Sequence, residues 1–293
     1  FPKTAWQDAE AVSKLLRALR DLGVTRLDSA ACYLPGDPGR AEELLRETKD
    51  AAGSDTFLID TKIVSDVGQS GGRGELTRQA IEASTAASLQ RLQRPGGVAD
   101  PTTPLEEQVQ SFHEQIPQGH CEAWGVANVP APMPEKMLQL CDQHGWTKPG
   151  CYQGQYNPGS RGMENWLLPL LRAHHMAFNG CQYVFDAGVE AHGLTSTEVA
   201  YRWLALSEGT NVQFDVGVLV YTFSFGKGDG ADSERIRYHS SLGEDDGIIL
   251  GASKLEQVTD TIALIRKGPP PDAVVSLAEE LWAAVKGTRG NEL

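Results

Sequence analysis

Apolar residues recur at two spacings along the chain, one typical of helices and one typical of strands, and the two alternate. One stripe at helical spacing lies within residues 8–22 and consists of Ala11, Leu15, Leu16, Leu19 and Leu22. Charged residues occupy the opposite face, so this segment is predicted to be an amphipathic helix that ends at Gly23. The next segment, VTRLDSAACY at 24–33, is short and β-prone, and we expect a strand there that gives way to a loop.

The same alternation continues to the end of the chain. Helices are predicted at 41–53, 76–92, 104–118, 134–145, 164–175, 195–206, 254–267 and 274–286. Strands are predicted at 57–62, 120–129, 150–157 and 247–253. Short strands that alternate with helices are typical of parallel β/α units, and this many units in 293 residues favours a closed barrel over an open sheet. We therefore expect an α/β fold, a (β/α)8 TIM barrel in an incomplete or rearranged form, with residues 1–293 as a single domain.

Composition narrows the classes of partner. The chain has 26 basic and 39 acidic side chains and a formal net charge of -13, which repels nucleic acid and anionic membrane surfaces. The five cysteines are odd in number, widely spread and without paired metal spacing, which is typical of reduced thiols. We expect a cytoplasmic protein with a small-molecule partner, no nucleic-acid or membrane partner and no metal site, and we leave a homodimer open.

Polar side chains stand where several predicted strands end. These residues are Asp28, Tyr33, Lys62, Asn128, Gln153 and Ser253. In an α/β barrel, the carboxyl ends of the strands surround the mouth of the active site. An ammonium group close to a phenol stabilises the phenolate and lowers the tyrosine pKa, so Lys62 beside Tyr33 would favour proton transfer near neutral pH. Asp28 would hold Lys62 in place and keep it charged.

Several segments also occur in the order found in one family. They are LDSAACY at 27–33, AEELL at 41–45, DTK at 60–62, SLQRLQ at 88–93, TTPLEE at 102–107, EAWGVANV at 122–129, YQGQYN at 152–157, TSTEVAYRWL at 195–204 and DGIILGASKLEQ at 246–257. With these motifs the chain resembles the aldo-keto reductase superfamily, particularly the branch that contains the aflatoxin aldehyde reductases. The resemblance extends through most of the chain.

The resemblance implies an NADPH-dependent oxidoreductase that reduces an aldehyde or ketone to an alcohol. Tyr33 would be the proton donor, Lys62 would lower its pKa, and Asp28 would support Lys62. Asn128 and Gln153 match residues that bind the nicotinamide carboxamide.

The resemblance also implies a cofactor phosphate site near the end of the chain. GASK at 251–254 opens a predicted helix and matches the phosphate-binding turn of the family, so Gly251, Ser253, Lys254 and Gln257 are implied to bind NADPH. Backbone amides at a helix N-terminus together with Lys254 would suit a 2′-phosphate, and salt screens the distant negative charge of the chain.

Two strands of the family pattern have no counterpart in this sequence. The strand that carries the catalytic His should lie between SLQRLQ and TTPLEE, where the chain has only RPGGVADP at 94–101, so this strand is missing or reduced to a stub. His113 and His120 follow later, the first inside a predicted helix and the second where a predicted strand begins, and we weigh both as substitutes. The first barrel strand, which should precede the helix at 8–22, is also missing, since only FPKTAW stands there. Loss of a hydrogen-bond donor such as this His costs on the order of 3 kcal/mol in related oxyanion sites.

Two further cofactor contacts of the family are uncertain in this sequence. Tyr183 or Phe185 is a candidate for the aromatic residue that stacks on the nicotinamide. Thr261 stands where an Asn on the adenine side is expected.

An unusual β-rich insertion occupies residues 207–237, between a predicted helix and the last predicted strand. Its segment VQFDVGVLVYTFSF at 212–225 is strongly β-prone. The segment would either rebuild the missing barrel wall or form an aggregation-prone edge. Because unpaired backbone groups are costly to bury, we expect residues between Val212 and Phe225 to pair with the barrel. Phe214, Val218 and Val220 are expected among the buried side chains.

The missing strands leave a second class of function open. It is a reductase-like barrel without hydride transfer, either a lyase, cyclase or isomerase that uses Tyr33 and Lys62 for proton transfer, or a non-catalytic binding subunit. Retention of Asp28, Tyr33, Lys62 and the GASK turn favours the reductase.

Overall fold

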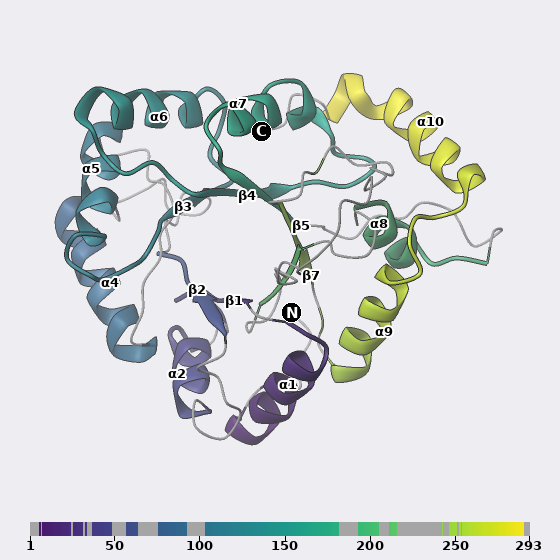
Figure 1. The fold of residues 1–293 in the computed structure, drawn as a ribbon, viewed down its shortest axis with the longest axis horizontal. Helices are drawn as coiled ribbons and strands as arrows, with labels where there is room; N and C mark the ends of the chain where they lie inside the picture. Colours follow the sequence, from purple (N-terminus) through teal and green to yellow (C-terminus); the bar gives the residue numbers. More distant parts are fainter. Residues whose placement is uncertain are drawn as a thin grey trace, which may run out of the picture.

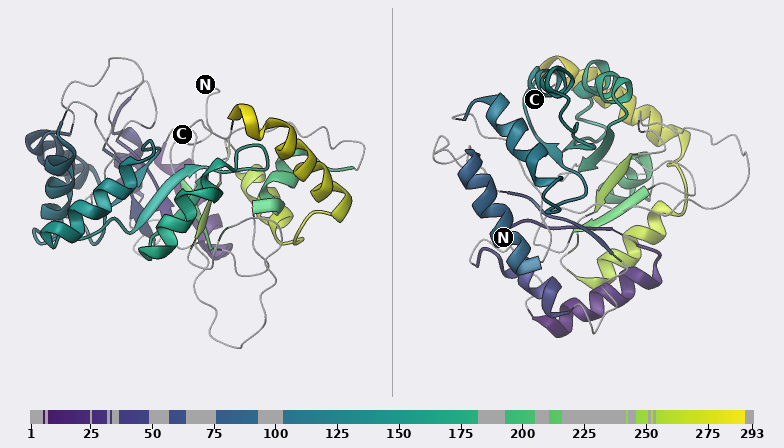
Figure 2. Two further views of the ribbon diagram at one scale, coloured as in Figure 1. Left: turned by 90° about the horizontal axis from the view of Figure 1, so that it is seen from above. Right: turned by 60° about the vertical axis from the view of Figure 1, so that its left-hand side comes forward.

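Parallel strands line the inside of a ring of helices (Figure 1). The turned views of Figure 2 show the same layering, with the helices outside and the strands inside. A computed structural model describes residues 6, 8–24, 26–31, 33, 37–48, 57–63, 76–92, 103–181, 193–204, 211–215, 242, 246–250, 252 and 254–289, and of 211–215 and 287–289 it describes the backbone alone.

The order of helices and strands along the chain follows the predicted alternation. The helices are α1 (Ala9–Asp21), α2 (Arg40–Glu47), α4 (Arg78–Leu92), α5 (Leu105–Gln115), α6 (Met133–His144), the 3-10 helix η2 (Gly162–Asn165), α7 (Leu167–Ala173), α8 (Ser196–Leu204), α9 (Leu255–Ile265) and α10 (Asp272–Arg289). The strands are β1 (Arg26–Asp28), β2 (Leu58–Asp60), β3 (Gly125–Ala127), β4 (Cys151–Gln155), β5 (Ala177–Cys181), β6 (Asn211–Asp215) and β7 (Gly247–Leu250).

Helix α1 shows how the sequence pattern produces one outer helix. Asp8 caps its N-terminus, with the side chain accepting from the backbone N–H of Ala11 at 2.8 Å. The residues that α1 buries against the barrel are Val12, Leu15, Leu16 and Leu19. Gly23 follows the helix with φ +81°, a backbone conformation that favours glycine, and the chain turns there into β1.

The strands of the described residues are hydrogen bonded in the order β2-β1-β6-β7-β5-β4-β3, and every pair is parallel. Parallel strands within a surrounding layer of helices form an α/β barrel, as the sequence predicts. Strands β2 and β3 are the two ends of the described sheet. The strand that would carry the catalytic His belongs between them in chain order, and residues 93–102 lie outside the described residues.

Strand β6 takes the position of the first barrel strand. In a (β/α)8 barrel, the first strand lies between the eighth and the second. Here β7, the strand of the last β/α unit, and β1, the strand that follows α1, both pair with β6. The inserted segment therefore occupies the position that the family pattern assigns to a strand before α1.

This pairing confirms part of the expectation for the insertion. Asn211–Asp215 forms a strand with a parallel partner on each side, and Phe214 is in register with Leu27 and Leu250. The other residues expected in the strand, Val218 and Val220 among them, lie outside the described residues, as does the side chain of Phe214.

Strand β5 is an element that the sequence did not predict. Its sequence, AFNGC, contains Asn and Gly and lacks β-branched residues, so its local propensity for strand is low. The strand pairs with β4 over five residues and with β7 over three, and four of its five residues are buried. Tertiary pairing therefore outweighs local propensity here. Within the described residues, no helix combines the length and apolarity needed to cross a membrane.

Replacing Gln213 by proline tests the central position of β6. Proline has no backbone N–H, so Gln213→Pro would leave an acceptor in a neighbouring strand unpaired and destabilise the fold by about 1–3 kcal/mol. Urea unfolding would measure the loss, with Gln213→Ala, which keeps the N–H, as the control. Equal free energies of unfolding for the two variants would contradict a doubly paired strand.

Candidate active site

The register of β1 and β2 brings the predicted site residues together. Asp28 lies opposite Asp60 in the parallel ladder. The pairing continues beyond both strands, since Ser29 N–H donates to the Asp60 carbonyl at 2.7 Å and Ala31 N–H donates to the Lys62 carbonyl at 3.3 Å. Lys62 is thereby held at the carboxyl ends of the strands, beside Asp28 and the loop that carries Tyr33.

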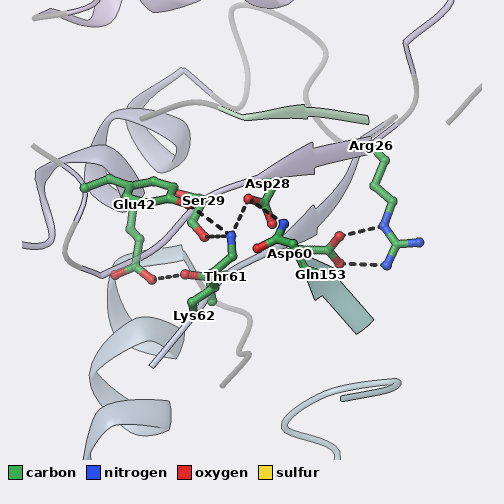
Figure 3. Close-up of polar contacts among 9 residues, drawn as sticks. Arg26, Asp28, Ser29, Glu42, Asp60, Thr61, Lys62 and Gln153 are labelled. Carbon is green, nitrogen blue, oxygen red and sulfur yellow. Dashed lines mark hydrogen bonds and ion pairs between the residues drawn. The ribbon is translucent and has the colours of Figure 1, made fainter. Parts of the chain in front are cut away.

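The Lys62 ammonium is the centre of the site (Figure 3). It pairs with the Asp28 carboxylate and donates to the Ser29 carbonyl at 3.1 Å. It also donates to the Tyr33 hydroxyl at 3.1 Å. Only 16% of the Lys62 side chain and 4% of the Asp28 side chain are exposed, so the pair is largely removed from water.

Burial dominates the electrostatics of Asp28. Burial raises the pKa of its carboxyl group, the positive charge of Lys62 opposes that rise, and the negative charge of Asp60 adds to it. Hydrogen bonds from Lys62 and Gln153 also act to lower the pKa. The pKa of Asp28 is raised overall, so Lys62 compensates the cost of burial only in part.

Tyr33 faces Lys62 from the loop after β1. Its backbone N–H donates to the Ala30 carbonyl at 3.1 Å, which folds the chain back over the end of the strand. The Lys62 ammonium lies 5.2 Å from the centre of the Tyr33 ring as well as within hydrogen-bonding distance of its hydroxyl. Because the phenol oxygen accepts in this contact, its own hydrogen is not used in it.

A buried carboxylate on α2 supports the residue before Lys62, and this contact was not predicted from the sequence. Glu42 is fully buried and accepts from the Thr61 hydroxyl at 2.7 Å and from the Arg91 guanidinium at 2.5 Å. Gly39 begins α2 with φ +91°, and a Cβ atom there would lie 2.7 Å from the side chain of Arg91. The signal was present in AEELL, where Glu42 lies between apolar residues that face the core.

Two of the predicted cofactor residues belong to neighbouring strands, since Asn128 directly follows β3 and Gln153 lies in the middle of β4. Gln153 is mostly buried, and its side-chain amide donates to Asp28 at 3.5 Å. Asn128 is exposed, has φ +51°, and its backbone N–H donates to the Gln153 carbonyl at 3.0 Å. Gln153 is thereby joined to the Lys62 and Asp28 pair, and Asn128 is its neighbour.

The predicted phosphate turn is described in part. Gly251 and Ser253 lie outside the described residues, as do Tyr183 and Phe185. Lys254 is exposed and caps the N-terminus of α9, where its backbone N–H donates to the Gln257 side chain at 3.1 Å. Thr261 is buried in α9.

His113 and His120, the two histidines weighed as substitutes, do not lie at the carboxyl ends of the strands. His113 contacts Thr147, in the loop that leads into β4, at 3.2 Å. His120, in the loop that leads into β3, contacts Gln115 on α5 at 3.0 Å. Both loops lie at the amino ends of their strands, opposite Lys62. Within the part of the chain that the structure describes, no group of three or more His, Cys, Asp or Glu side chains could hold a metal ion.

The geometry is that of a barrel protein in which a buried ammonium and carboxylate pair contacts a tyrosine hydroxyl. The chain belongs to the aldo/keto reductase family, whose model matches residues 2–189. The resemblance that the motifs indicate is confirmed.

Curated relatives place the chain near the predicted branch of this family. It is 28% identical to aldo-keto reductase family 7 member A3 of Homo sapiens, over 95% of this chain and 90% of the relative. It is also 28% identical to aflatoxin B1 aldehyde reductase member 2 of Mus musculus, over 95% of this chain and 82% of the relative. An aldo-keto reductase of Klebsiella pneumoniae, solved in complex with NADPH, has a TM-score of 0.62 at 19% identity, over 95% of this chain and 89% of that one. The predicted barrel fold is confirmed.

Replacing Glu42 tests its support of the site. Glu42→Ala would leave the Arg91 guanidinium without its buried carboxylate, and we expect the free energy of unfolding to fall by about 3 kcal/mol in urea titrations. Glu43→Ala is the control, because that side chain is 44% exposed and, within the described residues, pairs only with Arg40 on the same helix. A loss no larger than in Glu43→Ala would show that the buried contact contributes little.

Proposed function

We propose that this protein is an NADPH-dependent oxidoreductase that reduces an aldehyde or ketone to an alcohol, with Tyr33 as the proton donor. The observation that carries the proposal is the Lys62 ammonium, which contacts the Tyr33 hydroxyl at 3.1 Å and the Asp28 carboxylate together. Membership of the aldo/keto reductase family supports the same function.

The chain supplies the proton transfer. A positive charge beside a phenol stabilises the phenolate, so Lys62 makes the Tyr33 proton easier to release to the oxygen of a bound carbonyl group. Asp28 holds the ammonium charged and in place, and the Ser29 carbonyl accepts a further hydrogen bond from it. Burial of the pair strengthens these interactions, because the effective dielectric constant is lower away from water.

The residues present fit NADPH. The carbonyl and amide groups of Asn128 and Gln153 can pair with a carboxamide, and Gln153, in the middle of β4, lies next to Asp28. Lys254 stands at the first turn of an 11-residue helix, where backbone amides and the helix dipole favour an anion such as a 2′-phosphate. When bound, NADPH supplies a hydride to the carbonyl carbon. Gly251, Ser253 and Gln257 complete the proposed phosphate site.

The alternative without hydride transfer, in which the barrel is a lyase, cyclase, isomerase or binding subunit, rests on the missing catalytic His. His113 and His120 contact residues at the other end of the barrel, so neither replaces the catalytic His. The family assignment and the Asp28, Tyr33 and Lys62 arrangement favour the reductase.

We further propose a cytoplasmic protein that forms a single domain over residues 1–293, in which the insertion at 207–237 supplies part of the barrel. The odd number and wide spacing of the five cysteines support the location, and the pairing of β6 with β1 and β7 supports the single domain. A homodimer is compatible with this proposal.

Removing the Tyr33 hydroxyl tests the proton donor. Tyr33→Phe would lower kcat for carbonyl reduction at least about 100-fold, because the acid that protonates the carbonyl oxygen is lost, while NADPH binding stays nearly unchanged. Lys62→Met should behave similarly, since the tyrosine pKa rises without the ammonium. The control is Tyr201→Phe, which removes a hydroxyl from the outer helix α8. Wild-type turnover in Tyr33→Phe would refute the assignment.

Cofactor preference tests the phosphate site. If Lys254 contacts the 2′-phosphate, NADPH binds more tightly than NADH, and Lys254→Ala reduces that preference by about tenfold, because a charge-assisted contact is worth roughly 1.5–3 kcal/mol. Fluorescence titration of both cofactors would measure it. Lys267→Ala, at the opposite end of α9, is the control. Equal affinities of the wild-type protein for the two cofactors would exclude the site.

A further inference from the structure

A second ion pair lies next to Lys62 and Asp28 on the same two strands. Arg26, two residues before Asp28 on β1, donates to both carboxylate oxygens of Asp60, at 2.7 and 2.9 Å. Asp60 lies two residues before Lys62 in the sequence and is the register partner of Asp28. Side chains two residues apart on a strand point to the same face, and Figure 3 shows both pairs on one side of the two strands.

This register creates an electrostatic problem. Two carboxylates stand on neighbouring positions of adjacent strands, and like charges placed in this way destabilise each other. Asp60 contributes to the raised pKa of Asp28. An unpaired Asp60 carboxylate would also be a second acceptor for the only ammonium group among these four side chains.

We propose that Arg26 is a positioning residue. It binds the Asp60 carboxylate, so that the Lys62 ammonium hydrogen bonds to Asp28 and Tyr33 and not to Asp60. The proposal rests on the function proposed above for Tyr33 and Lys62. The two-pronged contact suits this role, because a guanidinium holds both oxygens of a carboxylate in a fixed geometry.

The charges of these four side chains on β1, on β2 and directly after β2 then sum to zero. These groups are Arg26 and Lys62, both positive, and Asp28 and Asp60, both negative. From β4, the Cys151 thiol faces the same region, and burial raises its pKa to about 12, so it is neutral at physiological pH. Burial by itself lowers the pKa of Arg26, but Asp60, with smaller contributions from Cys151 and Asp28, raises it overall, and the guanidinium stays charged.

The test follows the ionisation of Tyr33 in the full-length chain without added cofactor. The protein is labelled at the phenolic carbon of tyrosine, and of its seven tyrosine signals the one lost in Tyr33→Phe belongs to Tyr33. Arg26→Met leaves one extra negative charge, so the pKa of Tyr33 should rise by about one pH unit, whereas Asp60→Asn leaves one extra positive charge and should lower it by a similar amount.

The double variant Arg26→Met with Asp60→Asn distinguishes charge from structure. Its charges again sum to zero, so the pKa of Tyr33 should return close to the wild-type value. The control is Arg40→Met, which removes a similarly exposed two-pronged pair with Glu47 on α2 and should leave the Tyr33 titration unchanged. If Arg26→Met does not fold, the shift in Asp60→Asn and its reversal in the double variant still decide the question.

Two results would overturn the proposal. One is an unchanged Tyr33 titration in Asp60→Asn, and the other is a double variant that keeps the shift of either single change. Neither depends on turnover, because the titration measures the charge around Tyr33 whether or not carbonyls are reduced. Failure of the proposed function would instead appear as unchanged turnover in Tyr33→Phe.

Discussion

The contact between Asp28 and Lys62 is the interaction on which the site depends. Only 4% of the Asp28 side chain is exposed, so its carboxyl group is costly to ionise. The ammonium beside it offsets this cost only in part, because the pKa of Asp28 is still raised. A carboxyl group whose pKa is higher in the folded than in the unfolded state makes the fold more stable as the pH falls through the interval between the two values. At neutral pH the ionised Asp28 therefore weakens the fold, and the pair is better explained by its effect on Tyr33 than by stability.

That pair exists only because β1 and β2 run parallel in one register. A shift of β2 by one residue would turn Lys62 to the helix side of the sheet, away from Asp28. Contacts on both sides oppose such a shift: Glu42 holds Thr61 from α2, and β6 pairs with β1 along its other edge. The inserted strand is thus part of what keeps the catalytic register, although it lies in the chain more than 180 residues after β1.

The sequence predicted the barrel and the cluster of Asp28, Tyr33 and Lys62, because both follow from local patterns: alternating periodicity and polar residues at strand ends. Pairing between distant segments was harder to predict. Strand β5 has a low strand propensity of its own. The expected pairing of the insertion could not be assigned to a place until the ladder showed β6 between β7 and β1. Glu42 and Arg91 are 49 residues apart in the sequence, and the local sequence around either residue does not predict their contact.

The two ion pairs of β1 and β2 illustrate a constraint on such a site. A buried lysine stays charged more readily with a carboxylate nearby, and the in-register ladder places a second carboxylate, Asp60, beside the first. An apolar residue at position 60 would avoid the repulsion, but Asp60 in combination with Arg26 keeps the local charge at zero while adding polar groups that hydrogen bond to each other. The side chains of this second pair are each 32% exposed, against 4% for Asp28, so more water screens it and its burial costs less. The more buried pair, Asp28 and Lys62, contacts Tyr33. The more exposed pair, Arg26 and Asp60, sets the charge around it.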